Sequence, residues 1–286
     1  MIIISFCGGL GNQMFQYALL RKFVFLGKEV KADLSFYSKQ NVPSYQLEKI
    51  FGIKLPLATK EEINSLKDNL TFLRKVRRFF HIFWKNTDVQ QVYFDFNKKI
   101  FNLDSAYLEG YWQSEKFFLD VKDSLLEEFS FSKISSSNRT FLKEMKNLNL
   151  VSIHVRRGDY ESNPHAQKFH GNISTIKYYQ KAIEHINSHT KNPFFLIFSN
   201  DLDYVEKEFT FLKNKKIVSI NKNENSHLDM FLMSQCNHNI LANSSFSWWG
   251  AYLNMTPNKI VICPKKWVNN KQLDSPDIVP ENWIRL

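Results

Sequence analysis

The feature that most constrains the fold is a repeated alternation of short apolar runs with longer, partly polar segments. In the second half of the chain the runs are rich in β-branched and aromatic residues, as buried strands are. They occupy residues 150–155, 193–199, 216–220, 238–243 and 259–264. The segments at 175–189, 226–236 and 246–254 have the pattern of helices. Strands separated by such helices predict a doubly wound, mainly parallel sheet.

The first half opens in the same way. The apolar run 2–6 predicts a strand, the glycine-marked turn GGLGNQ follows, and residues 14–27 have the pattern of a helix that ends at a glycine. Residues 29–34 predict the next strand, and the polar, serine-rich segment 132–140 is the best linker candidate. We therefore expect two α/β domains, residues 1–140 and 141–286, facing each other across a cleft.

Composition limits the class of protein and of partner. Apolar residues make up 43% of the 286 residues, which predicts a packed core, and the formal net charge of +10 favours anionic partners. The three cysteines, Cys7, Cys236 and Cys263, form no CxxC pair, which favours a reducing compartment. We see neither a signal peptide nor an apolar run of about 18 residues, so we expect a cytoplasmic protein.

The segment HVRRGDY carries the clearest chemistry. Side chains alternate along a strand, so His154 and Arg156 share one face near its carboxyl end, the end that lines the ligand crevice of open α/β sheets. Adjacent guanidiniums at Arg156 and Arg157 suit a diphosphate. Asp159 would orient an arginine or hold a sugar hydroxyl. The alternative, a surface ion pair between Arg157 and Asp159, leaves Arg156 unexplained.

Two further segments offer nucleotide contacts. In HNILANSSFSWWGAYL a strand runs through Asn243 into Ser244 and Ser245 and then a helix, whose first amides could bind an anion, although plain capping gives the same pattern. In SHLDMFLMSQC, Ser226 and Asp229 fit a capping box. Alternatively, the Asp229 carboxylate accepts two hydrogen bonds from guanine, whose adjacent N–H donors adenine lacks.

The glycine turn of the first half invites comparison with a dinucleotide fingerprint. Gly9 and Gly11 give GxG, but Met14 stands where the third glycine belongs, although Asp33 lies where a ribose-binding acid would sit. We therefore do not expect NAD. Asn12 and Gln13 instead offer polar contacts toward the cleft.

Two more segments have competing interpretations. Asp201 and Asp203 imitate the DxD motif of metal-dependent sugar transferases, but an arginine pair already available for the diphosphate makes a metal unnecessary. The basic, aromatic segment 73–85 fits peripheral membrane contact, a nucleic-acid patch or an ordinary helix with a solvated basic face. We expect that the protein does not bind nucleic acid, because no nucleic-acid-binding fold is recognisable in the sequence.

Taken together, these segments resemble the α-1,2-fucosyltransferase family of bacteria and animals. The resemblance runs from residue 8 to near the C-terminus and rests on GGLGNQMFQYA, GYWQSEKFF, HVRRGDY, LDMFLMSQCNHNILANSSFSWWGAYLN and PKKW. More distantly, the chain resembles the α-1,6- and protein O-fucosyltransferases. The resemblance implies a GT-B fold, acceptor binding mainly in the N-terminal domain and GDP-fucose binding in the C-terminal one.

The resemblance also implies an activity: inverting, metal-independent transfer of L-fucose from GDP-β-L-fucose to the 2-hydroxyl of a terminal β-galactoside. The acceptor would belong to a bacterial surface glycan such as an O-antigen or capsule, and would be an oligosaccharide or a lipid-linked glycan. No cofactor is expected. The alternatives are a metal-dependent transferase using Asp201 and Asp203, and a non-catalytic protein that binds sugar nucleotides or glycans.

By this resemblance Arg156 contacts the β-phosphate, Asp229 reads guanine, and Ser244, Ser245 and Ser247 line the pocket. The residues assigned to donor binding are Gly9, Gly11, Asn12, Gln13, His154, Arg156, Arg157, Asp229, Asn243, Ser244, Ser245, Phe246 and Ser247. Arg156, Asp159 and His154 are the candidate catalytic residues. The candidates for a general base are Asp159, Glu115 and His154, in that order of preference, and a dissociative route with little help from a base stays open.

Overall fold

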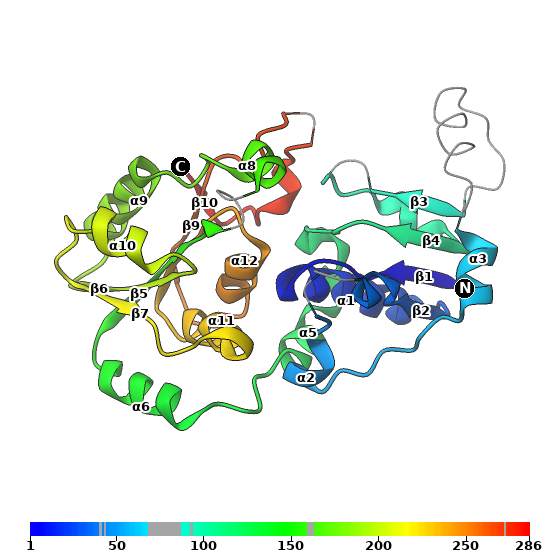
Figure 1. Ribbon diagram of the computed structural model, residues 1–286, viewed down its shortest axis with the longest axis horizontal. Coiled ribbons are helices and arrows are strands. Elements are labelled where there is room, and N and C mark those ends of the chain that lie inside the picture. Colours follow the sequence, from blue (N-terminus) through cyan, green and yellow to red (C-terminus); the bar gives the residue numbers. More distant parts are fainter. Residues whose placement is uncertain (40–41, 43, 68–86, 92–93, 159–162, 272) are drawn as a thin grey trace. The chain divides into compact units, whose positions relative to one another are not determined.

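The computed structural model describes residues 1–39, 42, 44–67, 87–91, 94–158, 163–271 and 273–286. Within them the chain forms two compact units, Met1–Ser130 and Phe131–Leu286 (Figure 1). The domain boundary predicted at residue 140 lies inside a helix of the second unit, α6 (Ser136–Met145). The predicted linker at 132–140 is therefore partly helical, because the Ser135 hydroxyl accepts a hydrogen bond from the Asn138 amide and caps α6.

The first unit contains a parallel sheet of four strands in the order β2-β1-β4-β3. Its elements are β1 (Ile2–Ser5), α1 (Leu10–Phe25), β2 (Val30–Asp33), α2 (Leu47–Phe51), α3 (Lys60–Leu66), β3 (Asp88–Gln90), β4 (Ala106–Glu109) and α5 (Lys122–Glu128), with short 3₁₀ helices η1 (Ser35–Ser38), η2 (Lys98–Asn102), η3 (Glu115–Phe117) and η4 (Leu119–Val121). The predicted strands at 2–6 and 29–34 and the helix between them are confirmed.

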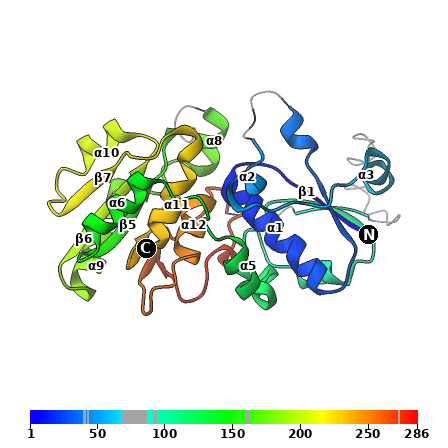
Figure 2. The ribbon, with the colours of Figure 1, turned by 90° about the horizontal axis from the view of Figure 1, so that it is seen from below.

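Helices cover both faces of this first sheet. The long helix α1 packs along β1 and β2 (Figure 2). On the other face, Ile3 of β1 and Tyr107 of β4 are fully buried against Leu66 and Ile63 of α3. The strands are short, and their carboxyl ends bring Cys7, Gly8 and Gly110 to one edge of the sheet.

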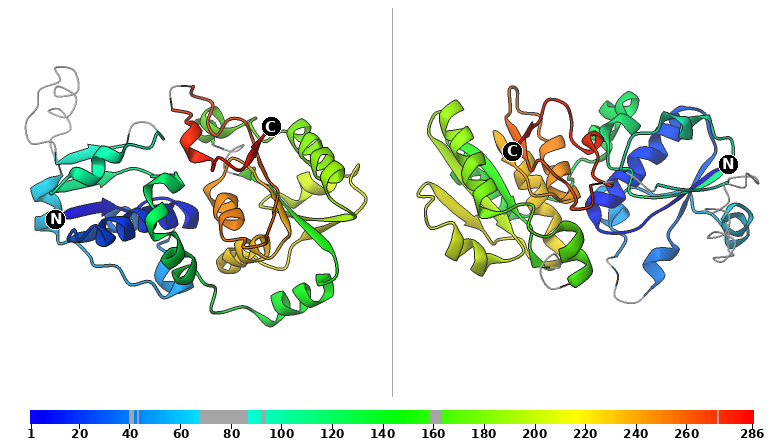
Figure 3. Two further views of the ribbon diagram at one scale, coloured as in Figure 1. Left: turned by 180° about the vertical axis from the view of Figure 1, so that it is seen from behind. Right: turned by 90° about the horizontal axis from the view of Figure 1, so that it is seen from above.

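The second unit contains a parallel sheet of six strands in the order β10-β9-β8-β5-β6-β7. Its elements are α6 (Ser136–Met145), β5 (Asn149–Val155), α8 (Pro164–His170), α9 (Ile176–His189), β6 (Pro193–Ser199), α10 (Leu202–Glu208), β7 (Lys215–Val218), η5 (Asn223–Asn225), α11 (His227–Ser234), β8 (His238–Ile240), α12 (Ser245–Tyr252), β9 (Val261–Cys263), η6 (Pro276–Ile278) and β10 (Ile284–Arg285). The final strand β10, red in Figure 3, pairs with β9 at the sheet edge.

This strand order is that of a Rossmann fold. Numbered within the unit, the strands run 3-2-1-4-5-6, with β5 as the first and β8 as the fourth. The chain builds outward from β5 to β6 and β7, then returns to the other side of β5 with β8. The strand order thus reverses between β5 and β8, and a ligand is expected at the carboxyl ends of these two strands.

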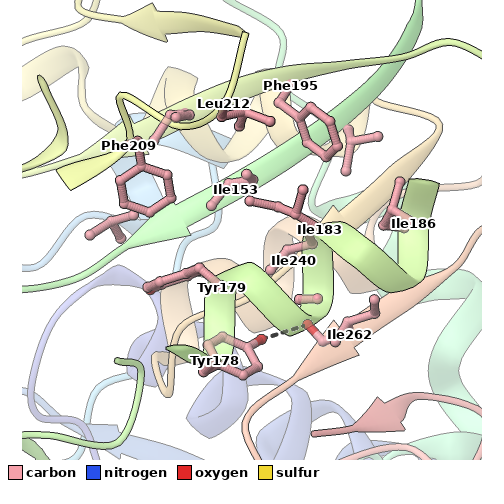
Figure 4. Close-up of a cluster of buried hydrophobic side chains, with 14 of the residues drawn as sticks. Ile153, Tyr178, Tyr179, Ile183, Ile186, Phe195, Phe209, Leu212, Ile240 and Ile262 are labelled. Atoms are coloured by element: carbon pink, nitrogen blue, oxygen red, sulfur yellow. Dashed lines mark hydrogen bonds between the residues drawn. The ribbon is translucent and has the colours of Figure 1, made fainter. Parts of the chain in front are cut away.

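Alternation along β5 divides its side chains between two cores. Val151, Ile153 and Val155 pack against Tyr179 and Ile183 of α9, together with the other residues labelled in Figure 4. On the opposite face the core is built by α6, α11 and α12, and includes Phe141, Leu232 and Met233. Helices therefore cover both faces of the sheet, and His154 and Arg156 lie on the side of α11 and α12.

Candidate active site

Arg156 follows directly on β5 and is half-buried. Its charge lies close enough to His154 to lower the pKa of that imidazole. Because β5 pairs with β8, Arg156 stands beside the segment that leads from β8 into α12. The predicted anion-binding arginine therefore follows the strand at the switch point of the sheet, the place where ligands bind in such sheets.

His154 precedes it and is buried. Burial and, to a smaller extent, the positive charge of Arg156 lower the pKa of His154 to about 3. Its ring lies 5.7 Å from that of Phe246, and Nδ1 is buried without a hydrogen-bond partner in the described part of the chain. At neutral pH the imidazole is uncharged, so it can donate or accept a hydrogen bond but is a poor proton acceptor. The low pKa argues against His154 as the general base.

Arg157 is engaged within the protein. Its Nε lies 3.2 Å from Oδ2 of Asp201, its guanidinium carbon lies 3.8 Å from the centre of the Tyr204 ring, and its amide donates to Oδ1 of Asn200 over 3.0 Å. The predicted phosphate contact is not supported, because the guanidinium is held by a carboxylate and an aromatic face. Asp159, named as its alternative partner and as the first candidate base, lies outside the described residues.

Asp201 is the partner of Arg157 and also caps α10. Its Oδ1 accepts from the Tyr204 amide over 3.1 Å, and its Oδ2 receives the Arg157 bond. Asp203 is exposed in the first turn of that helix. The DxD segment is thus a helix N-cap, and its first carboxylate is used on both oxygens. Across the ranges that the structure describes, no group of three His, Cys, Asp or Glu residues could hold a metal ion.

The turn between β8 and α12 has an inward and an outward part. Asn243 is 2% exposed, and its amide donates to the carbonyls of His170 and Trp267 and accepts from the Ser174 hydroxyl. Ser247 is fully buried, with its hydroxyl directed at the Ala242 and Ser244 carbonyls. The predicted donor contacts of these two side chains are wrong, because both are used to hold the turn.

The part of the turn that begins α12 comprises Ser244, which is buried, and Ser245 and Phe246, which are partly exposed. Ser244 is the N-cap residue of α12, but no side chain makes a capping hydrogen bond there. The first N–H groups of a helix have no intrahelical acceptor, and the helix dipole adds partial positive charge. The uncapped start of α12 therefore offers donors to an anion beside β5. Trp248 and Trp249 are fully buried and serve as core.

Asp229 lies in the first turn of α11, the helix that precedes β8. The capping-box alternative is wrong, since the Ser226 side chain makes no capping bond. The carboxylate accepts one hydrogen bond from Nδ2 of Asn221 over 2.8 Å. Burial raises the pKa of Asp229 to about 7, and the Asn221 hydrogen bond opposes that rise. A partly buried carboxylate with a raised pKa is stabilised in its ionised form by a ligand that brings further N–H donors.

The glycine turn of the first unit has a more structural role than predicted. Gly8 has φ +79°, and a Cβ there would lie 2.5 Å from Nδ2 of Asn12, so this position requires glycine. Gly9 is the N-cap residue of α1, and Gly11 is buried in its first turn. Gln13 is fully buried, donating to the carbonyls of Gly8 and Ser44 and accepting from the Gln46 amide. The predicted ligand contact of Gln13 is therefore wrong.

Asn12 and Asp33 complete this region. Asn12 is partly exposed and accepts from the Gln113 amide over 2.8 Å. Asp33 is 2% exposed and accepts from the Tyr107 hydroxyl over 2.7 Å and from the Ser35 amide. A buried Asp33 held in this way is not placed to bind a ribose, which agrees with our rejection of a dinucleotide fingerprint.

The carboxyl edge of the first sheet also carries a group of aromatic side chains that the sequence did not single out. Tyr37 and Tyr45 have ring centres 6.0 Å apart, and the Tyr37 hydroxyl donates to the Gly8 carbonyl. Phe94 and Tyr111 are stacked with centres 6.3 Å apart, and Tyr111 is 41% exposed. Their faces suit the apolar side of a sugar ring.

Comparison with known proteins places the chain. The sequence matches glycosyl transferase family 11 over residues 1–286. It is 32% identical over 295 residues to an α-1,2-colitosyltransferase of Escherichia coli, with 100% of this chain and 98% of that protein covered. The chain belongs to glycosyl transferase family 11. WbnK, an O-antigen biosynthesis glycosyltransferase of Escherichia coli, is 32% identical over 305 residues, with 98% of each protein covered.

Animal family 11 enzymes are more distant. Galactoside α-(1,2)-fucosyltransferase 2 of Bos taurus is 25% identical over 260 residues, with 87% of this chain and 68% of that protein covered. Among solved structures, the fucosyltransferase NodZ from Bradyrhizobium has a TM-score of 0.51 at 13% identity, covering 91% of this chain and 94% of that one. This likeness and the two parallel sheets confirm the predicted α/β, GT-B-like fold class.

The predicted membrane contact through residues 73–85 lies outside the described residues. None of the helices in the parts of the family 11 chain that are described is both long and apolar enough to cross a membrane. Glu115, the remaining candidate base, is partly exposed in η3 of the first unit.

Proposed function

We propose that this family 11 glycosyltransferase transfers L-fucose from GDP-β-L-fucose to the 2-hydroxyl of a terminal β-galactoside with inversion. The observation that carries the proposal is that Arg156 and the uncapped start of α12 follow the two neighbouring strands β5 and β8 at the switch point of the sheet. These are two independent anion-binding features on neighbouring strands. Asp229, on the helix that leads into β8, supplies an acceptor for the guanine edge.

In the proposed reaction the bond between fucose and the β-phosphate breaks, and negative charge builds on the leaving GDP. The Arg156 guanidinium and the amides of Ser245 and Phe246 would stabilise that charge. The acceptor hydroxyl attacks the cation-like fucosyl carbon from the opposite face. With His154 uncharged and only weakly basic, Asp159 and Glu115 stay as candidates for the group that takes the hydroxyl proton.

We propose that no metal is required. The charge of the diphosphate is met by a guanidinium and a helix terminus, and the Asp201 carboxylate is committed to Arg157 and to the α10 cap. A metal-dependent transferase would need these oxygens for the cation. Activity lost with EDTA and restored by Mn²⁺ would support that alternative.

We assign acceptor binding mainly to the first unit. The stacked pair Phe94 and Tyr111 and the partly exposed amide of Asn12 lie on loops that follow the strands of its sheet. Sugar rings bind to aromatic faces with their apolar side while amides hold their hydroxyls. An acceptor glycan for bacterial surface synthesis fits the name of WbnK, and a lipid-linked form would bring residues 73–85 near a membrane.

A second donor has one specific observation in its favour. The 32% identity to an α-1,2-colitosyltransferase extends over the whole chain. Colitose is L-fucose without its 3-hydroxyl, so the two donors share the GDP group and differ at one position of the sugar. The proposed phosphate and guanine contacts serve either donor.

The test is a GDP-release assay in which purified protein receives GDP-fucose or GDP-colitose with a panel of β-galactosides, followed by linkage analysis of the product. Release that requires a β-galactoside, with an α-1,2 linkage from GDP-fucose, supports the proposal. If the protein prefers GDP-colitose, the proposed donor sugar changes from fucose to colitose and the proposed nucleotide-binding site stands. Nucleotide binding without release over hours would indicate a non-catalytic binding protein.

A further inference from the structure

The Asp229 carboxylate is held by a chain of amides that reaches to the start of α6. Asn221, in the loop after β7, donates through Nδ2 to Oδ1 of Asp229 over 2.8 Å and to Oδ1 of Asn138 over 3.0 Å. The Asn221 carbonyl accepts from Nδ2 of Asn138 over 2.7 Å. The two amides thus exchange a pair of hydrogen bonds, and the remaining N–H of Asn221 is directed at the carboxylate.

The far end of this chain is also fixed. Asn138 is fully buried in the first turn of α6, and its Nδ2 also donates to the Ser135 hydroxyl over 2.7 Å. Helix α6 packs against α11, which carries Asp229. Rotating the Asn221 amide by half a turn would set its oxygen against the Asp229 carboxylate and break both bonds to Asn138. The amide is therefore locked as a donor toward Asp229.

Only one oxygen of Asp229 is used in this way. Oδ2 receives no hydrogen bond from any residue in the described ranges. A guanine base offers two adjacent N–H donors, and a carboxylate can accept them while Oδ1 keeps its bond to Asn221. Because burial raises the pKa of Asp229, its ionised form depends on such donors.

We propose that Asn221, locked by Asn138, is a positioning residue that keeps the Asp229 carboxylate oriented and charged for guanine. This inference rests on the proposed function, since it specifies how the GDP group would be read. Asn221 touches neither the sugar nor the phosphates in this account. Its effect should therefore appear in nucleotide selectivity and in the pH dependence of binding.

The elements next to Asp229 carry further titratable and charged groups, which are kept constant in the experiment. They are Lys222 and Glu224 in the adjoining turn, His227 on α11, and Arg139, Lys143 and Glu144 on α6. Helix α12 contributes only the phenol of Tyr252. The pKa of Asp229 is raised by burial and lowered by Asn221, so changing Asn221 acts on it directly.

The experiment measures the dissociation constants of GDP and IDP by calorimetry between pH 6 and pH 9. IDP lacks the 2-amino group and so presents one donor fewer to the carboxylate. The variants are Asn221→Ala, the isosteric Asn221→Asp, Asp229→Ala, and the exposed neighbour Asn225→Ala as matched control. Thermal melting of each variant confirms that it is folded.

For Asn221→Ala we expect GDP binding at pH 7 to weaken by about fivefold, because raising the Asp229 pKa from about 7 by about one unit lowers its ionised fraction from about a half to about a tenth. The loss should shrink toward none at pH 9, and the preference for GDP over IDP should fall at pH 7. Asn221→Asp should bind GDP more weakly still, because a second carboxylate of the same shape replaces the N–H donor beside Asp229.

Three outcomes overturn the inference. In the first outcome, the wild type prefers GDP over IDP, Asp229→Ala loses that preference, and both Asn221 variants bind the nucleotides as Asn225→Ala does. Asn221 then has no positioning role, and the proposed function stands. A loss in Asn221→Ala that is equal at pH 6 and pH 9 also overturns it. If the wild type itself does not prefer GDP, the guanine assignment falls together with the inference.

Discussion

Replacing Asp229 by asparagine should make the protein more stable while removing its preference for guanine. The pKa of Asp229 is about 7 in the folded chain, against its ordinary value of 3.8. Because the folded chain binds this proton more tightly than the unfolded chain, the stability that this group contributes falls as the pH rises from 3.8 to about 7. At about 1.4 kcal/mol per pH unit, the full effect is about 4 kcal/mol above pH 7.

The variant Asp229→Asn has no such titration, and its side-chain carbonyl can still accept the Asn221 bond. Urea unfolding of both proteins at pH 5 and pH 8 measures the difference. We expect the advantage of the variant to be about 3 kcal/mol larger at pH 8 than at pH 5, because two of the three pH units of loss fall between these values. An equal difference at both pH values, or a variant that is less stable at pH 8, would refute the reasoning.

Four further predictions concern single residues. Arg156→Ala should lower transfer by about a thousandfold with an unchanged melting temperature, and near-normal turnover would contradict the diphosphate assignment. Asn243→Ala should cost about 2–3 kcal/mol in urea unfolding, since its buried amide bonds two carbonyls and a hydroxyl; a cost near zero would mean that these bonds do not hold the turn. Asp201→Ala should lower the free energy of unfolding by about 1 kcal/mol through loss of the α10 cap, and its transfer rate should stay within a few-fold of the wild type and not respond to EDTA. If metal ions stimulate the wild type and the variant loses that stimulation, the DxD interpretation is restored. Tyr111→Ala should raise the acceptor KM about tenfold with GDP affinity unchanged, and an unaffected KM would remove the aromatic pair from the acceptor site.

The fold could be predicted largely from the sequence because its strands are buried on both faces. Residues 193–198 form an uninterrupted apolar run, and β6 covers them together with Ser199. Helix starts were harder. The Asn163-Pro164 pair begins α8 with an asparagine cap and a proline in its first turn, a signal that the sequence contained and that was missed. The serines around residue 135 likewise predict a linker, although one of them caps α6.

The site was harder to predict, because adjacent polar residues at a strand end can have different roles. Asn243 and Ser244 are neighbours, yet one ties three segments of backbone together and the other begins an uncapped helix. Arg156 and Arg157 divide in the same way. Strand alternation predicts the face of the sheet on which Arg156 lies. The partner of Arg157, Asp201, lies 44 positions further along the chain, and only the fold brings the two side chains together.

Asp201 also shows why short acidic motifs are ambiguous. An aspartate that follows a strand and precedes a helix satisfies both the DxD pattern and the N-cap pattern, and the amide of Tyr204 decides between them. Asn221 had no signal at all, because a single amide in a polar turn resembles any loop residue until the fold places it beside Asp229.

The central claim is that Arg156 and the start of α12 hold the diphosphate of a GDP-sugar while its sugar moves to a galactoside 2-hydroxyl. The most direct measurement is GDP release from GDP-fucose with a β-galactoside, by the wild type and Arg156→Ala, with linkage analysis of the product. The account predicts acceptor-dependent release and an α-1,2 product for the wild type, and neither for the variant. Equal release by both proteins, or a different linkage, would contradict it.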